Sequence, residues 1–340
     1  MKIIVTGCAG LIGSWLCDAL LELGHNVVGI DNLSSGYADN IPVHKNFQFV
    51  NRSLEDFARL VDCFDGVDFV YHAAAAAYEG YSVFAPTAIT QNIVGSSTAV
   101  ITAAANARVK RVVNMSSMAR YGHGVLPYRE SSVPSPVDPY GQAKLFAEQQ
   151  MNLVGKLHDV EVCHVVPHNV NGPRQRYDDP FRNVMSIMAN MMLQGRQPII
   201  YGDGQQARGF CDVRDNIQTL VMLLDASIEH GEVFNIGPDD PKEFVTVNRL
   251  AAMIADSVGF KSLDPLYIEP RPTEVKLSMC SSDKIKQRFN FKQTISLEEN
   301  INSVVAYIRK RGTRNFVYHT PIEVYHTPLN IPRSWKERLF

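Results

Sequence analysis

Residues 2–31 read KIIVTGCAGLIGSWLCDALLELGHNVVGID, and this stretch decides the fold. It begins with a short apolar, β-branched run, which is typical of a buried parallel strand. A glycine-rich turn at 7–13 follows, and then an amphipathic helical stretch that closes at Gly24. A second apolar run over 26–30 ends in Asp31. The pattern predicts a strand, a glycine turn, a helix, a second strand and an acid, in that order.

This unit predicts a dinucleotide site. Glycines at positions 7, 10 and 13 let the backbone turn tightly and approach a pyrophosphate, because no Cβ stands in the way. The helix N-terminus after them offers free N–H groups to the same phosphates. Asp31 is placed to accept hydrogen bonds from ribose hydroxyls and to repel a 2′-phosphate, which favours NAD over NADP. A plain strand-to-helix turn is the alternative, but the strand, the helix and the acid all fall where a dinucleotide needs them.

Composition narrows the class of protein. The 340 residues are 45% hydrophobic and 20% charged, as in an ordinary globular protein with one large domain or two intimate ones. A formal net charge of −2 gives no electrostatic reason to expect nucleic acid or a membrane as partner. The six cysteines show no CxxC spacing, which favours free thiols over disulfides or a metal site. With no apolar run of ~20 residues and no signal peptide, we expect a cytoplasmic protein.

Strand-like and helix-like segments alternate along the first half of the chain. Alternation of this kind predicts an α/β fold, a Rossmann doubly wound parallel sheet. Ligands of such sheets bind beyond the carboxyl ends of the strands. We expect Asp31, Ala74, Ser117 and His168 at those ends. The predicted strands are 47–50, 67–72, 111–117 and 160–166, and the predicted helices are 54–64, 87–107 and 140–158.

Turn residues become denser after residue 168, which indicates a second, smaller α/β domain. We expect residues 1–168 to form the NAD-binding domain and 205–236 to return to it, with a helix at 214–225. The substrate-binding domain is then formed by 169–204 and 237–311, with helices near 184–193 and 247–258. Residues 312–340 are expected to be an arm packed on the body or on a partner subunit.

Tyr140 and Lys144 carry the second strong signal. Residues four apart share one face of a helix, so the Lys144 charge is expected beside the Tyr140 phenol, where it favours the phenolate. A tyrosine activated in this way is a general acid and base near neutral pH. Ser117, at the end of a predicted strand, is placed to bind a substrate hydroxyl or oxyanion. Taken alone, the Tyr–Lys pair is better explained by an amphipathic helix with a surface lysine, and the dinucleotide unit and Ser117 reverse that preference.

These motifs together resemble the extended short-chain dehydrogenases/reductases, and within them the NAD-dependent nucleotide-sugar epimerases and dehydratases. The resemblance covers about residues 1–310. It departs from the family at Arg52-Ser53, where Gly-Asp is usual, and at Val166, Asn171 and Gly209, where arginine, tyrosine and aspartate are usual. The matching motifs are Gly7-x-x-Gly10-x-x-Gly13, Asp31–Gly36, Tyr71–Ala75, Asn92-x-x-Gly95, Ser116-Ser117, Tyr121-Gly122, Pro139-Tyr140-Gly141-x-x-Lys144, His168–Gln175, Tyr201–Gln205 with Arg208, Phe234–Gly237 and Arg271-Pro272-x-Glu274-Val275.

The resemblance implies a role for each matching residue. Ser117, Tyr140 and Lys144 match the catalytic trio, and Ser117, Asn169, Arg208, Arg271 and Glu274 match substrate-binding positions. Arginine forks suit paired phosphate oxygens, although either arginine alone is also explained as a solvated charge, and Asn92 as helix packing. The positions that match cofactor-binding residues are Gly7, Gly10, Leu11, Ile12, Gly13, Asp31, Asn32, Ser35, Gly36, Ser53, Leu54, Ala74, Ala75, Asn92, Tyr140, Lys144 and His168.

The family resemblance also frames the reaction. Its members oxidise the sugar at C4, and Tyr140 would take the hydroxyl proton as a hydride passes to NAD. Dehydratases carry Asp-Glu after the catalytic serine or threonine, and decarboxylases carry a glutamate there, but this chain has Met118 and Ala119. Neither transfers a proton, which favours C4 epimerisation of a nucleotide sugar through a transient 4-keto intermediate. Glu79 is a candidate acid from elsewhere, although a surface glutamate is the favoured interpretation of this residue.

Several alternatives stay open. A dehydratase or another 4-keto-forming enzyme of the family is the first, and a non-catalytic NAD- or sugar-binding regulator is the second. By analogy the nucleotide is UDP, and a small residue such as Ser278 leaves room for an N-acetyl group on the sugar. Small and aliphatic residues on several faces of the helices at 87–107 and 140–158 favour a homodimer through a four-helix interface.

Overall fold

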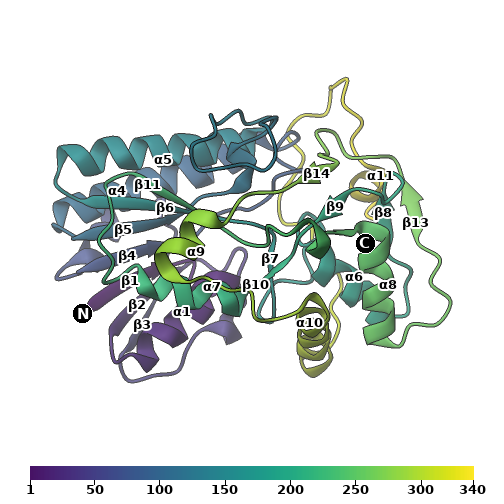
Figure 1. The fold of residues 1–340 in the computed structure, drawn as a ribbon, viewed down its shortest axis with the longest axis horizontal. Helices are drawn as coiled ribbons and strands as arrows, with labels where there is room; N and C mark the ends of the chain where they lie inside the picture. Colours follow the sequence, from purple (N-terminus) through teal and green to yellow (C-terminus); the bar gives the residue numbers. More distant parts are fainter.

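The computed structural model describes all 340 residues and contains a seven-stranded parallel sheet (Figure 1). Its spatial order, β11-β6-β5-β4-β1-β2-β3, reverses direction beside β1, as in a doubly wound sheet. The predicted fold class is therefore confirmed. The strands are β1 (Lys2–Thr6), β2 (Asn26–Asp31), β3 (Phe47–Asn51), β4 (Phe69–His72), β5 (Arg111–Met115), β6 (Glu161–Pro167) and β11 (Glu232–Ile236).

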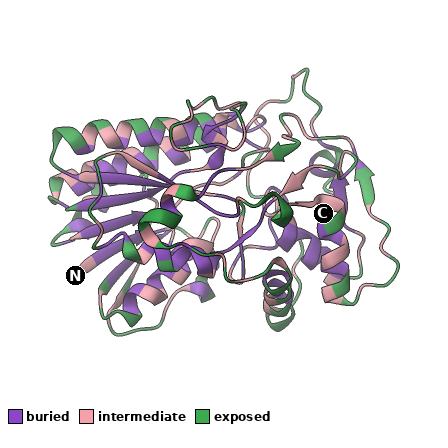
Figure 2. Ribbon diagram, in the orientation of Figure 1, coloured by how far each residue is buried: buried purple, intermediate pink, exposed green.

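Helices cover both faces of the sheet, and the strands between them are largely buried, except for the edge strand β3 (Figure 2). On one face lie α4 (Ser96–Asn106) and α5 (Pro139–Leu157), which pack against each other. On the other face α1 (Leu11–Glu22) packs against α7 (Val213–Met222). Burial of apolar side chains from both faces of the sheet is what drives this layered arrangement.

Two predicted helices are interrupted. The helix expected over 87–107 is split into α3 (Pro86–Thr90), a π-helical turn at Gln91–Gly95, and α4. The helix expected over 54–64 is only α2 (Phe57–Leu60), followed by a 3₁₀ turn at Val61–Phe64. The π turn coincides with a side-chain contact, since the Asn92 amide oxygen accepts a hydrogen bond of 2.8 Å from the backbone N–H of Ala76. Such turns concentrate at functional sites.

The strand expected over 111–117 ends earlier, at Met115. Ser117 instead caps a 3₁₀ turn at Met118–Arg120, because its hydroxyl accepts a hydrogen bond from the Ala119 N–H. A 3₁₀ turn directly after a strand directs Ser117 beyond the carboxyl edge of the sheet. The other 3₁₀ turns of the chain are Ala38–Asn40, after β2, Val61–Phe64, after α2, and Pro241–Glu243, after β11.

Three further helices pack on one another around a separate apolar cluster at the other end of the molecule (Figure 1). They are α6 (Val184–Leu193), α8 (Val247–Val258) and α10 (Leu297–Arg311). Between them and the large sheet, α9 (Asp283–Phe289) packs on β11. Small sheets complete this part: β12 (Val245–Thr246) with β9 (Ala207–Arg208) and β14 (Leu277–Ser278), β8 (Ile199–Tyr201) with β13 (Leu266–Ile268), and β7 (Val170–Asn171) with β10 (Cys211–Asp212).

Residues 312–340 run over the junction of the two parts, shown in yellow in Figure 1. Their one helix, α11 (Arg333–Lys336), buries Trp335 against Tyr81 and Phe181. The Glu323 carboxylate accepts hydrogen bonds from the first N–H groups of α3, at Thr87 (2.8 Å) and Ala88 (3.0 Å). The arm is therefore anchored by both apolar packing and a helix cap. None of the helices is long and apolar enough to cross a membrane.

Candidate active site

A first cavity opens at the carboxyl edge of the sheet, beyond β1, β2, β4 and β5. It is lined by the glycine turn, the loop after β2, the alanine run after β4, and the start of α5. With the exception of His168, every residue predicted to bind the cofactor lines it. These residues are Gly7, Gly10, Leu11, Ile12, Gly13, Asp31, Asn32, Ser35, Gly36, Ser53, Leu54, Ala74, Ala75, Asn92, Tyr140 and Lys144.

Two glycine positions of the turn, Gly7 and Gly13, leave no room for a side chain. Gly7 has a φ of +71°, and a Cβ built on it would lie 2.8 Å from the backbone nitrogen of Ala74. A Cβ on Gly13 would collide with the carbonyl oxygen of Gly7. The turn therefore presents bare backbone N–H groups next to the start of α1, which is the cradle that a pyrophosphate requires.

The Asp31 carboxylate is held firmly at the rim of the first cavity. One oxygen accepts a hydrogen bond from the Ala9 N–H (3.0 Å) and the other from the Leu33 N–H (2.7 Å). Burial raises the pKa of Asp31, and these two hydrogen bonds oppose that rise. Because a carboxylate has about four acceptor positions, both oxygens keep a free one for ribose hydroxyls.

Tyr140 and Lys144 lie on the buried face of α5, with only 7% and 5% of their surface exposed. Lys144 donates a hydrogen bond of 2.9 Å to the carbonyl oxygen of Met115, at the end of β5. The start of the helix is fixed by Asp138, which accepts from the Gly141 N–H at 2.8 Å. It is also fixed by the Ser82 hydroxyl, which accepts from the Tyr140 N–H at 3.2 Å.

The protonation of this pair differs from the sequence-based expectation. Burial raises the pKa of Tyr140 and outweighs the hydroxyl of Ser117, which lowers it without meeting the geometry of a full hydrogen bond. Burial also lowers the pKa of Lys144 to about 8, against the nearby charge of Glu148. In both groups desolvation outweighs the nearby charges, which opposes the expected stabilisation of a Tyr140 phenolate by Lys144.

A buried ion pair that was not predicted from the sequence lies next to Ser117 and Lys144 in the chain. Arg120 and Glu148 lie 3.0 Å apart with almost no exposure, and Glu148 also accepts a hydrogen bond from the Ser116 hydroxyl. Ser116 directly precedes Ser117, and Glu148 lies one helical turn after Lys144. The pair thus ties the end of β5 to α5. Neither residue belongs to a recognisable motif, because their role depends on a contact between two positions far apart in the sequence.

A second cavity continues from the first toward α6 and the small sheets. Ser117 and Asn169 line both cavities, so the two meet at these residues. The remaining residues predicted to bind substrate, Arg208, Arg271 and Glu274, line the second cavity alone. The Glu274 carboxylate binds both guanidinium groups, with Arg208 Nη2 at 2.9 Å from one oxygen and Arg271 Nε at 2.8 Å from the other.

Other residues singled out in the sequence also face the second cavity, among them Glu79, Met118, Ala119 and Ser278. His168, predicted on the cofactor side, lines this cavity and not the first. It is 2% exposed, its Nε2 has no partner, and its Nδ1 lies 3.7 Å from the Cys280 sulfur. Burial lowers the pKa of His168 to about 4, so the ring is neutral at physiological pH.

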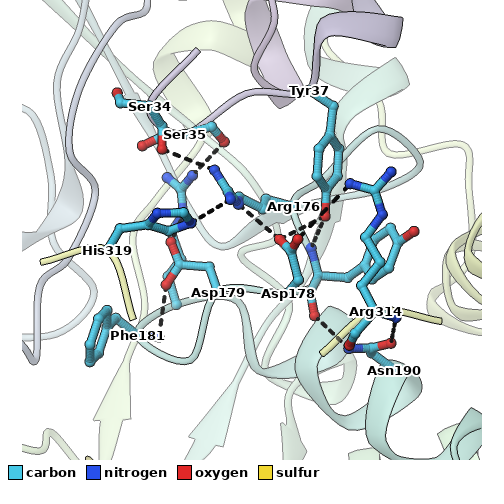
Figure 3. Close-up of polar contacts among 12 residues, drawn as sticks. Ser34, Ser35, Tyr37, Arg176, Asp178, Asp179, Phe181, Asn190, Arg314 and His319 are labelled. Carbon is cyan, nitrogen blue, oxygen red and sulfur yellow. Dashed lines mark hydrogen bonds and ion pairs between the residues drawn. The ribbon is translucent and has the colours of Figure 1, made fainter. Parts of the chain in front are cut away.

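A polar network, which we call the clasp, borders the first cavity, since its members Ser34, Ser35, Arg176 and Arg182 line that cavity (Figure 3). Arg176 donates to the carbonyl oxygen of Ser34 (2.9 Å), and Arg182 donates to that of Ser35 (3.1 Å). Asp178 accepts from Arg176 (2.8 Å) and from the Tyr37 hydroxyl (2.9 Å), while His319 of the arm bonds to Arg176. The clasp comprises Ser34, Ser35, Tyr37, Arg176, Asp178, Arg182 and His319.

Comparison with known proteins agrees with this geometry. Residues 3–237 match the model of the NAD dependent epimerase/dehydratase family. A UDP-glucose 4-epimerase from Mycolicibacterium smegmatis is 32% identical over 92% of this chain and 100% of its own length.

Two solved structures share the fold. A Thermotoga maritima UDP-glucose 4-epimerase with UDP-glucose has a TM-score of 0.84 and 31% identity, covering 92% of this chain and 99% of its own. A Bacillus cereus UDP-glucuronic acid 4-epimerase in complex with UDP-glucuronic acid and NAD has a TM-score of 0.83 and 27% identity, covering 92% and 100%. The chain belongs to the NAD dependent epimerase/dehydratase family.

Proposed function

We propose that this protein is an NAD-dependent 4-epimerase of a nucleotide sugar, in which Ser117, Tyr140 and Lys144 are the catalytic residues. The observation that carries the proposal is their position. Ser117 lies where the first cavity, with its dinucleotide cradle, meets the second cavity, with its paired arginines, and Tyr140 and Lys144 line the first cavity. A sugar bound in the second cavity would present its reacting carbon to a cofactor in the first.

The residues around the first cavity fit NAD. The bare glycine turn suits the pyrophosphate, and Asp31 suits the adenosine ribose and disfavours a 2′-phosphate. Ser53, Asn92 and Ala74 also line this cavity. When bound, NAD supplies a hydride acceptor and later a donor at the sugar carbon.

Tyr140 is the proton carrier. We propose that Tyr140, in its phenolate form, takes the proton of the sugar C4 hydroxyl and returns it after the sugar has turned, while the Ser117 hydroxyl orients the phenol oxygen. Lys144, anchored on the Met115 carbonyl, holds a positive charge nearby when it is protonated. Because Met118 and Ala119 carry no titratable group, a 4-keto sugar meets no acid or base there that would expel water.

The second cavity fits the nucleotide diphosphate. Guanidinium groups bind phosphate oxygens in a bidentate manner, and Arg208 and Arg271 are already held side by side by Glu274. We propose UDP as the nucleotide, which is the nucleotide named for the relatives, and a hexose or N-acetylhexosamine as the sugar. Ser278 in the cavity wall leaves space for an N-acetyl group.

The test is direct. Purified protein incubated with UDP-glucose or UDP-N-acetylglucosamine is expected to form the 4-epimer without net NADH. A loss of 18 mass units would instead identify a dehydratase of the same family, which is the alternative function. Binding of NAD and UDP-sugar with no turnover of any sugar nucleotide would leave a non-catalytic regulator.

We also propose that the protein forms a homodimer. Two further predictions stay proposals: that it is a cytoplasmic enzyme, and that residues 1–168 form a cofactor domain beside a smaller substrate domain. Three large apolar side chains, Phe146, Leu153 and Leu157, are exposed on α5. Their spacing of seven and four residues places them on one face of the helix, where a second copy would cover them. Light scattering checks this, and a monomeric mass would refute it.

A further inference from the structure

The turn after the alanine run brings one carboxylate into the second cavity. Tyr78 and Tyr81 are buried on either side of Glu79, and their hydroxyls donate to Asp179 (2.8 Å) and to the carbonyl oxygen of Thr320 (2.8 Å). Glu79 is exposed and, with Gly80, lines the second cavity. The two anchored tyrosines thus fix the backbone in a course that leaves Glu79 facing the cavity.

The same turn is tied to the catalytic helix. The Ser82 hydroxyl donates to the carbonyl oxygen of Glu79 (2.7 Å) and accepts from the N–H of Tyr140 (3.2 Å). One side chain therefore connects the backbone of Glu79 to that of Tyr140. Glu79 cannot shift far along the cavity unless this connection breaks, so its distance from the reacting tyrosine is set by the fold.

The Glu79 carboxylate has no hydrogen-bond or ion-pair partner in the protein. Arg208 and Arg271 are near, but both are bound by Glu274. A Cβ on Gly80 would lie 3.4 Å from Arg271 Nη1, so the turn approaches the arginines closely with its backbone and not with the carboxylate. A free acceptor group therefore lines the same cavity as the arginines and Ser117.

The environment of this carboxylate is enclosed although it opens to the cavity. Desolvation and the charge of Asp138 raise the pKa of Glu79 to about 7, against the lowering effect of Arg271 and Arg208. The charge of Glu79 in turn is among the influences that raise the pKa of Tyr140, which places the two groups within electrostatic reach. A solvated surface glutamate would show neither effect.

Building on the proposed function, we propose that Glu79 contacts the sugar of the nucleotide-sugar substrate and selects neutral sugars over sugars that carry a carboxylate. A sugar whose diphosphate is held by Arg208 and Arg271, and whose reacting carbon lies at Ser117, must pass Glu79. The carboxylate accepts hydrogen bonds from neutral sugar hydroxyls. It repels a second carboxylate in the same cavity, where the nearby arginines, Arg208 and Arg271, are already bound by Glu274.

The test compares UDP-glucose with UDP-glucuronic acid on the NAD-loaded enzyme. In Glu79→Gln the ratio of kcat/KM for the neutral over the acidic sugar is expected to fall by about tenfold or more, because one charge-assisted contact and one repulsion are lost. The affinity for UDP alone, measured by calorimetry, is expected to hold or tighten. Glu298→Gln, an exposed glutamate on α10, is the matched control and should leave the ratio unchanged.

Two outcomes would overturn the inference. One is an unchanged ratio in both Glu79→Gln and Glu79→Ala. The other is an equal loss of affinity for UDP and for UDP-glucose, since Glu79 would then serve only as a counter-ion of the arginines. If no sugar is epimerised by the wild-type protein, the proposed function fails, but the ratio of the two binding constants still tests Glu79 by itself.

Discussion

The two cavities are built in different ways. The first is formed by short, continuous motifs at the ends of neighbouring strands, and its contacts are mostly backbone, as at Gly7 and Gly13. The second gathers side chains from segments far apart in the chain, and charged groups such as Arg208, Arg271 and Glu274 hold one another in place. A backbone cradle tolerates no added atoms, whereas an ion-pair network tolerates exchange of its members.

This difference implies that the first cavity is rigid and common to the family, while the second is where specificity resides. We therefore expect substitutions that add atoms to the cradle to weaken cofactor binding, and substitutions that change charge in the second cavity to alter substrate selection. Tyr140 and Ser117 belong to neither regime, because in the proposed function they act on bonds that change during the reaction.

The largest effect is expected at Tyr140. Tyr140→Phe removes the only proton carrier placed at the reacting carbon, so kcat should fall by about 10²–10⁴-fold, the usual contribution of a general acid–base. NAD and UDP should bind as before, because the ring and its packing remain. Steady-state kinetics with calorimetry check this, and Tyr267→Phe, exposed on β13, is the control. An unchanged kcat would sink the mechanism.

The next effect is expected in the backbone cradle. In Gly13→Ala the new methyl group meets the Gly7 carbonyl, so the turn must open, and the affinity for NAD should fall on the order of a hundredfold. In Gly95→Ala the methyl group finds its nearest neighbour, Glu55 Cγ, at 3.8 Å, and NAD binding should be nearly unaffected. If both variants bind NAD equally well, the cradle is not the pyrophosphate site.

The first cavity was largely predictable from sequence because local rules govern it. Gly7, Gly10, Gly13 and Asp31 belong to one strand–turn–helix–strand unit, and the i, i+4 spacing places Tyr140 and Lys144 on one helix face. What these rules cannot supply is solvation. Whether Lys144 or burial controls the pKa of Tyr140 depends on how completely the rest of the chain encloses the pair, and burial dominates.

The remaining parts of the site depend on pairs of residues that are far apart in sequence. Arg120 with Glu148, and Arg176 with Asp178 and His319, show no periodicity or spacing that marks them. The π turn at Asn92 is similar, since the helix pattern predicts a regular helix and only the contact with Ala76 accounts for the interruption. Glu79 had an ambiguous sequence signal, and its placement in the second cavity separates it from a surface residue.

Substrate affinity should respond to charge geometry in the second cavity. Arg271→Lys keeps the charge but loses the planar fork, so KM for UDP-glucose should rise about tenfold while NAD affinity stays the same. Isothermal titration with UDP and with NAD separates the two effects. A parallel loss of NAD affinity would show that the cavities are not independent, and would break the comparison drawn between them.

Acid stability should report on buried histidines next to both cavities. Burial lowers the pKa of His72 to about 3 and that of His168 to about 4, from 6.5. Below pH 6.5 the unfolded chain binds more protons than the fold, so the free energy of unfolding falls as pH drops toward 4. His168→Gln should reduce this slope by about 1.4 kcal/mol per pH unit, measured by urea unfolding. An unaltered slope would contradict a neutral, buried His168.

The smallest effect is expected at the clasp. There the first cavity, like the second, is bordered by charged side chains that bind one another. Arg176→Ala removes the contacts to Ser34, Asp178 and His319. The loop after β2, which contains Ser34, is then held less firmly. NAD should then dissociate about threefold to tenfold faster, with little change in kcat. Lys310→Ala, an exposed cation on α10, is the control for charge. His319→Ala should give a smaller acceleration of the same kind, because it removes only the arm's contact with Arg176. Equal NAD release in all three variants would mean that the glycine cradle alone retains the cofactor.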